Sequence, residues 1–140
     1  MGNIQLLEGA RLRIVDDDPE SCEMMLEALR RYGASVECAM SAAEATTKLP
    51  EFRPDVVLSD IAMPGRDGYA VLSEVRQVET ALGRRVPVAA VSACAHAEDR
   101  QRAMAAGFDR YLAKPVDPAA LAATVKALMA IGNRQLTEPG

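Results

Sequence analysis

The chain has 140 residues, which suits a single domain, and 49% of them are hydrophobic, which is enough for one core. Its net charge is −4 and acids and bases are mixed along the chain, which argues against a nucleic-acid partner or attraction to an anionic membrane. The sequence shows neither a signal-like start nor the ~20 consecutive apolar residues that a membrane span needs, so we expect a cytoplasmic domain without membrane contact. Cys22, Cys38 and Cys94 lack Cys-x-x-Cys spacing, so we expect buried free thiols rather than a disulfide framework or a zinc site.

Short apolar runs alternate with amphipathic segments along the whole chain. We expect strands at residues 12–15, 34–39, 55–59, 88–91 and 110–113, and helices that begin near residues 18, 41, 69, 97 and 117. Short connections between such units favour parallel strands, because each return of the chain crosses one face of the sheet as a helix. The pattern therefore predicts an α/β fold with helices on both faces of a parallel sheet.

Local signals set the ends of these helices. Asp18 is the expected N-cap of the first helix, with Pro19 at its first position and Gly33 after its end, so capping accounts for Asp18. The second helix is expected to open with the capping box at residues 41–44 and to stop at Pro50. The third and fourth are expected at residues 69–78 and 97–106. Four methionines at helical spacing are expected in or near the core: Met24, Met25, Met104 and Met129.

Polar side chains stand at the carboxyl ends of four expected strands. Asp16 and Asp17 follow the first strand, Asp60 the third, Ser92 the fourth and Lys114 the fifth. These strand ends meet at one edge of a parallel sheet, where open α/β sheets bind ligands. Two carboxylates suit a hard divalent cation, a third can act as a nucleophile, and a hydroxyl and an ammonium suit a phosphoryl group. Repulsion among the three carboxylates is expected to raise the pKa of at least one of them.

The sequence strings at residues 15–20, 54–68, 91–93 and 111–115 resemble the receiver domain of two-component response regulators. The resemblance covers residues 11–131, with residues 1–10 as an N-terminal extension or linker and residues 132–140 as a C-terminal tail. It implies a flavodoxin-like, five-stranded, doubly wound parallel sheet of order 2-1-3-4-5.

The resemblance also implies roles for the acidic residues. Asp60 matches the phosphoacceptor, and Asp16 and Asp17 match the acidic pair that holds Mg²⁺ together with Asp60 and the backbone carbonyl of Ala62. Mn²⁺ is an expected substitute for Mg²⁺.

Other matching positions surround the phosphoryl group. Ser92, the backbone of Ala93 and Lys114 match groups that contact it, and Ser92 and Tyr111 match the two switch residues. The peptide bond between Lys114 and Pro115 is expected to be cis. Phosphorylation would change the face made by the fourth helix, fifth strand and fifth helix.

A receiver implies a sensor histidine kinase or a histidine phosphotransfer domain as phosphodonor, and an output domain or partner protein downstream. It is a signalling domain that catalyses only its own phosphorylation and slow dephosphorylation. Residues 7–12 resemble the linker before the C-terminal receiver of hybrid sensor kinases, so the chain is either such a module or a free-standing regulator.

Two alternatives use the same residues differently. A small haloacid-dehalogenase-type phosphatase would use Asp16 as nucleophile, but Pro19 and Glu20 do not suit that motif and Asp60 would have no role. A degenerate receiver would act only as a protein-binding module, although all of the phosphorylation residues are present. Asp67 is assigned to a turn and His96, the single histidine, to the surface near a helix start.

Overall fold

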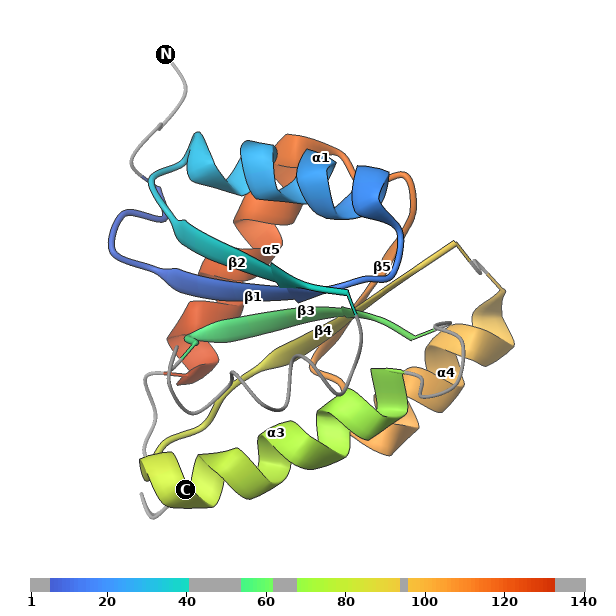
Figure 1. Ribbon diagram of the computed structural model, residues 1–140. Coiled ribbons are helices and arrows are strands. Elements are labelled where there is room, and N and C mark those ends of the chain that lie inside the picture. Colours follow the sequence, from blue (N-terminus) through green and yellow to red (C-terminus); the bar gives the residue numbers. More distant parts are fainter. Residues whose placement is uncertain (1–5, 41–53, 62–67, 94–95, 133–140) are drawn as a thin grey trace.

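The computed structural model describes residues 6–40, 54–61, 68–93 and 96–132. In these residues five parallel strands form one sheet in the order β2-β1-β3-β4-β5, which confirms the predicted topology (Figure 1). The strands are β1 (Arg11–Val15), β2 (Ser35–Ala39), β3 (Val56–Asp60), β4 (Val88–Ser92) and β5 (Arg110–Ala113).

Four described helices cover the two faces of this sheet: α1 (Pro19–Arg30), α3 (Gly68–Leu82), α4 (Ala97–Ala106) and α5 (Pro118–Gly132). Helices α1 and α5 lie on one face, and α3 and α4 lie on the other (Figure 1). The helix expected from residue 41 and the turn at Asp67 lie outside the described residues. None of the helices in the described ranges is long and apolar enough to cross a membrane.

Helix ends follow the predicted capping chemistry. The Asp18 side chain accepts a hydrogen bond from the Glu20 N–H at 3.2 Å, with Pro19 as the first residue of α1. Gly107 follows α4 with φ of +119°, a left-handed conformation that a residue with a side chain rarely adopts. Asp117 caps α5, because its carboxylate accepts from the Ala120 N–H at 3.0 Å.

Several predicted boundaries differ from the structure by a residue or more, and three of them are informative. Strands β3 and β4 each extend one residue further, so Asp60 and Ser92 are themselves the last residues of buried strands. Helix α3 continues four residues beyond the predicted end at residue 78. The carboxylate of Glu79 is buried there and accepts from the Val86 N–H at 2.6 Å, so a polar residue continues the helix instead of ending it.

The core has one layer on each face of the sheet. Alternate residues along a strand point to opposite faces, so Ile14 and Leu58 pack with α1 and α5 while Val15 and Val57 pack with α3 and α4. Each fully buried aliphatic side chain of this kind contributes about 1.5–3 kcal/mol of transfer free energy. The central strands are thereby fixed, and with them the positions of the residues at their ends.

The methionine prediction is only half confirmed. Met25 is buried and Met129 packs against the core, but Met24 is 55% exposed and Met104 is 42% exposed. Met24 is a neighbour of Met25 and points about 100° away around the helix, so both cannot face the sheet. Helix α4 buries only Ala103 among its residues, which leaves Met104 on its outer side.

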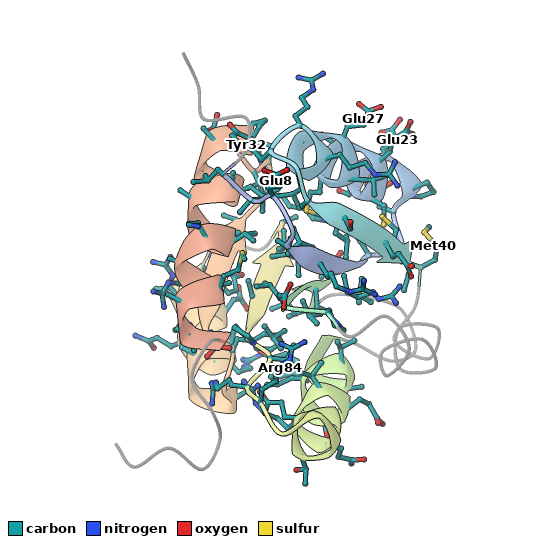
Figure 2. All side chains as sticks on the ribbon, turned by 90° about the vertical axis from the view of Figure 1, so that its left-hand side faces the viewer. Glu8, Glu23, Glu27, Tyr32, Met40 and Arg84 are labelled. Atoms are coloured by element: carbon teal, nitrogen blue, oxygen red, sulfur yellow. The ribbon has the colours of Figure 1, made fainter. Side chains whose placement is uncertain are left out.

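The segment before β1 packs on the α1–α5 side of the molecule. Leu7 and Ala10 are fully buried, and the Leu7 N–H donates to the Tyr32 carbonyl at 2.8 Å. Figure 2 shows Glu8 and Tyr32 close together at this end of the molecule. Leu7 and Ala10 therefore belong to the core layer between the sheet and helices α1 and α5.

Candidate functional site

The parallel register brings the predicted site residues to one edge of the sheet. Val15 pairs with Ser59, Asp60 with Val91, and Ser92 with Ala113. Asp16 and Lys114 are each the next residue after their strands, so they lie level with Asp60 and Ser92. The edge that sequence analysis predicted is therefore present in the structure.

Three carboxylates come together at this edge. Oxygen atoms of Asp16, Asp17 and Asp60 lie within 4.8 Å of one another. Asp16 is fully buried, Asp60 is 8% exposed and Asp17 is exposed to solvent. Such a set of oxygen ligands, open on one side, suits Mg²⁺, which usually keeps several waters and takes only one or two carboxylates. Ala62, predicted to add a backbone carbonyl, lies outside the described residues.

The ammonium of Lys114 lies between two of these carboxylates. Its Nζ is 2.7 Å from Oδ2 of Asp16 and 3.3 Å from Oδ2 of Asp60. Burial lowers the pKa of Lys114, but its hydrogen bonds and charge interactions with Asp16 and Asp60 outweigh burial and leave that pKa raised. Lys114 therefore stays charged and neutralises part of the negative charge of the site.

Asp16 is held on both of its carboxylate oxygens. Oδ1 accepts from the Asp18 N–H at 2.9 Å, and Oδ2 accepts from Lys114. Burial raises the pKa of the Asp16 carboxyl, while these hydrogen bonds lower it, and repulsion by Asp60 adds the smallest contribution. The expected rise in a carboxyl pKa is confirmed, but its main cause is loss of solvation rather than like-charge repulsion.

Ser92 and Tyr111, the predicted switch pair, lie on neighbouring strands. Ser92 is fully buried, and its backbone carbonyl accepts from the Lys114 N–H at 2.8 Å, which ties the end of β5 to the end of β4. Tyr111 is 7% exposed, and the Arg100 guanidinium of α4 lies 5.9 Å from the centre of its ring. The Lys114–Pro115 peptide bond is cis, as predicted.

One feature of the site was missed by sequence analysis. A cavity of about 310 Å³ opens beside Lys114 and Ala93, between α1 and the start of α5. Its lining is mostly apolar and includes Met24, Pro115 and Leu121. The adjacent pair Met24–Met25 was the available signal, since one of two consecutive helical residues has to face away from the core.

His96 and Asp18 lie where sequence analysis predicted them, at the surface near a helix start and at a helix cap. His96 is exposed and precedes α4 as its N-cap residue. The Asp18 carboxylate is used by the first turn of α1.

Known proteins match this chain over most of its length. The family model described as response regulator receiver domain matches residues 12–126. An uncharacterised 14.6 kDa protein of Leptolyngbya boryana is 39% identical over 115 residues, covering 82% of this chain and 86% of that protein.

Two further relatives are longer than this chain. The transcriptional regulatory protein PrrA of Mycobacterium tuberculosis is 40% identical over 119 residues, which are 85% of this chain and 49% of PrrA. The sensor histidine kinase RcsC of Escherichia coli is 37% identical over 103 residues, which are 74% of this chain and 10% of RcsC. The chain thus spans about half of one relative and a tenth of the other.

A solved structure gives the same fold. The chemotaxis protein CheY4 of Vibrio cholerae is 28% identical, with a TM-score of 0.76 over 85% of this chain and 98% of that one. Family match, sequence similarity and fold agree with the geometry of the strand ends. The chain belongs to the receiver domain family of two-component response regulators.

Proposed function

We propose that Asp60 accepts a phosphoryl group from the phosphohistidine of a sensor histidine kinase or a histidine phosphotransfer domain. The observation that carries this proposal is the placement of the Asp60 carboxylate. It ends a buried strand, remains 8% exposed, and lies 3.3 Å from the Lys114 ammonium and beside the Asp16 carboxylate. A nucleophile held next to fixed charges is what phosphoryl transfer requires, because the reaction depends on positioning and charge neutralisation.

The transfer itself exchanges one bond for another. An oxygen of Asp60 forms a bond to phosphorus while the P–N bond of the phosphohistidine breaks, and the imidazole leaves with the electron pair. Lys114, the Ser92 hydroxyl and the Ala93 N–H are proposed to contact the phosphoryl oxygens. The chain thereby catalyses its own phosphorylation and its own slow dephosphorylation and needs no further substrate.

Asp16, Asp17, Asp60 and the Ala62 carbonyl are the proposed ligands of Mg²⁺, with Mn²⁺ as a substitute. The donor set fits, because three carboxylates and one ammonium leave an excess of negative charge at the site. When bound, such a cation supplies neutralisation of negative charge on phosphoryl oxygens. The solvent exposure of Asp17 leaves that side of the cluster open to water ligands.

The phosphatase alternative is disfavoured by the geometry of Asp16. This side chain is fully buried, and its oxygens already accept from the Asp18 N–H and from Lys114. Asp60 is the more exposed carboxylate of the two. A degenerate receiver that only binds a partner would not be phosphorylated, so phosphorylation of Asp60 distinguishes the proposal from that alternative.

The apolar cavity beside Lys114 supports docking of a helix that carries the phosphohistidine. Met24 is 55% exposed at its rim, and methionine adapts to varied apolar surfaces. Glu23 and Glu27 project from the outer side of α1 in Figure 2, so a basic flank on the donor would complement this helix. A donor seated there would present its phosphohistidine to the neighbouring Asp60.

The response is proposed to pass from Ser92 to Tyr111 and to alter the α4-β5-α5 face. Phosphorylation would shift a population between two arrangements of this face. An output domain or partner protein would read the change. Similarity to PrrA and to RcsC supports both settings, a regulator with its own output region and a receiver on a kinase polypeptide.

The free thiols of Cys22 and Cys38 suit the reducing cytoplasm, where we place this reaction.

Asp60→Asn is expected to abolish labelling by acetyl phosphate, because an amide oxygen is a far poorer nucleophile than a carboxylate. Intact-protein mass spectrometry would show a gain of one phosphoryl group in the wild-type chain and none in the variant. Chelation of Mg²⁺ should stop the wild-type reaction as well. Labelling of Asp60→Asn at the wild-type rate would refute the assignment.

Asp17→Ala is expected to weaken Mg²⁺ binding at least tenfold, about 1.4 kcal/mol, because one anionic ligand leaves the site. The neighbouring Asp18→Ala variant is the matched control, since it removes a carboxylate that caps α1. It should cost about 1 kcal/mol of unfolding free energy and leave Mg²⁺ affinity unchanged. Isothermal titration calorimetry with Mg²⁺ measures the affinity of both variants. A greater loss of affinity in Asp18→Ala than in Asp17→Ala would assign the metal to Asp18.

Lys114→Met is expected to lower the free energy of unfolding without Mg²⁺ by about 1–3 kcal/mol, because buried Asp16 loses its charged donor. Added Mg²⁺ should restore part of the loss. Urea unfolding with and without Mg²⁺ measures both effects. Equal destabilisation under both conditions would show that Lys114 acts through packing and not through charge.

Met24→Glu is expected to slow transfer from a phosphorylated histidine phosphotransfer domain at least tenfold, about 1.4 kcal/mol, by burying a charge at the interface. Labelling by acetyl phosphate should stay unchanged, because Met24 lies outside the carboxylate cluster. Met104→Glu on α4 is the control, since it changes a similarly exposed methionine on the opposite face. Equal transfer rates for both variants would place the donor elsewhere.

A further inference from the structure

Three sulfur atoms gather where the start of α1 meets the end of β2. The Cys22 Sγ lies 3.9 Å from the Met40 Sδ. The Cys38 Sγ is also 3.7 Å from the Cys22 carbonyl oxygen. None of the three side chains has a role in the proposed phosphoryl transfer.

We propose that Cys22, Cys38 and Met40 form a binding site for a Cu(I) ion. Two thiolates and one thioether are soft ligands, and this combination selects Cu(I) over hard cations such as Mg²⁺. A thioether is a poor ligand for Zn²⁺, whose usual partners are thiolate, imidazole and carboxylate groups. The ligand set therefore points to a monovalent soft ion and separates this site from the carboxylate cluster.

The sulfur spacing suits a shared ion. Metal–sulfur bonds of ~2.3 Å place two ligands of one trigonal or tetrahedral ion roughly 3.8–4.0 Å apart. The distance of 3.9 Å between the Cys22 and Met40 sulfurs falls within that range. Since the Cys38 Sγ already lies 3.7 Å from the Cys22 carbonyl oxygen, rotations of the side chains would bring the three sulfurs around one centre.

The backbone explains why the sulfurs meet. Cys38 belongs to β2, and Met40 is the second residue after it. The Asp16 N–H donates to the Ala39 carbonyl at 3.0 Å, which fixes the end of β2 beside the loop that leads into α1. The first turns of α1 then place Cys22 over that end, with its thiol donating to the Asp16 carbonyl at 3.2 Å.

Charge and proton balance are compatible with the proposal. Each coordinated cysteine loses its thiol proton to solvent as its sulfur–copper bond forms, so the complex carries one negative charge. The pKa of Cys38 is lowered by its interaction with Cys22 and by the positive charges of Arg30 and Arg13, which favours the thiolate that the ion requires.

An ion can reach the cluster from solvent. Met40 is 37% exposed and projects from the edge of the molecule at the end of β2 (Figure 2). Cys38 is half-buried and Cys22 is only 4% exposed, so exposure falls from the thioether to the inner thiol. The site therefore has an outer ligand for entry and an inner ligand shielded from water.

The test is a Cu(I) titration of the reduced chain under anaerobic conditions, in competition with bicinchoninate. The expected result is one tightly held equivalent in the wild type and in Cys94→Ser. Cys38→Ser should lose this binding, and Met40→Leu should weaken it at least about tenfold. Met104→Leu should bind as the wild type does, since it removes an exposed methionine outside the cluster.

Several outcomes would overturn the proposal. These are equal Cu(I) affinity in Met40→Leu and wild type, equal Cu(I) affinity in Cys38→Ser and wild type, or loss of binding in Cys94→Ser. Cys22→Ser is left out because Cys22 is buried, and circular dichroism confirms that each variant used is folded. The titration contains neither Mg²⁺ nor phosphodonor, so its result does not depend on the proposed phosphorylation of Asp60.

Discussion

The contact of one ammonium with two carboxylates organises the functional end of this molecule. Lys114 bridges Asp16 and Asp60 although these residues are 98 and 54 positions away in the chain. Without that ammonium, Asp16 would be a fully buried anion beside a second anion, an arrangement that costs several kcal/mol. The bridge forms only when β1, β3 and β5 stand in the observed order, with β4 between the last two. The site is therefore complete only when all of these strands are in place.

The same contact would allow a divalent cation to replace the Lys114 ammonium beside Asp16. A divalent cation held by Asp16 and Asp17 would compete with Lys114 for the oxygen of Asp16, and would free the ammonium to face a phosphoryl group on Asp60. The backbone of Lys114 would not need to move, because its N–H stays bonded to the Ser92 carbonyl. The long lysine side chain supplies the reach. Burying neighbouring carboxylates is unfavourable, and binding of a cation would reduce that unfavourable free energy.

Sequence analysis predicted the positions of residues that lie at the ends of strands. Asp16, Asp60, Ser92 and Lys114 could be assigned to one edge because parallel strands share their direction. Strand order came from the family resemblance, since hydrophobic patterns do not specify which strands are neighbours. The end of α3 was missed because the buried Glu79 carboxylate depends on an N–H seven residues later, beyond the range of a local signal.

Features made by contacts between distant elements were also missed. The cavity beside Lys114 combines residues of α1 with residues of the β5–α5 connection, and the sulfur cluster combines α1 with the end of β2. Cysteine spacing could not indicate the cluster, because Cys22 and Cys38 are 16 residues apart and the spacing motifs for cysteine and histidine ligands do not include methionine. Burial likewise decided the pKa of Asp16, and burial depends on the whole sheet.

Helix α4 buries far fewer of its residues than the strands beside it. The strands β3 and β4 are buried along their whole length, whereas α4 buries only Ala103 among its ten residues. Arg100 adds a hydrogen bond to the Tyr111 carbonyl at 3.4 Å and a contact with the Tyr111 ring. Elements with few buried apolar contacts open at low free energy. A phosphoryl group that contacts Ser92 would therefore act on the neighbouring Tyr111, and through it on α4, which buries the fewest residues of the described helices.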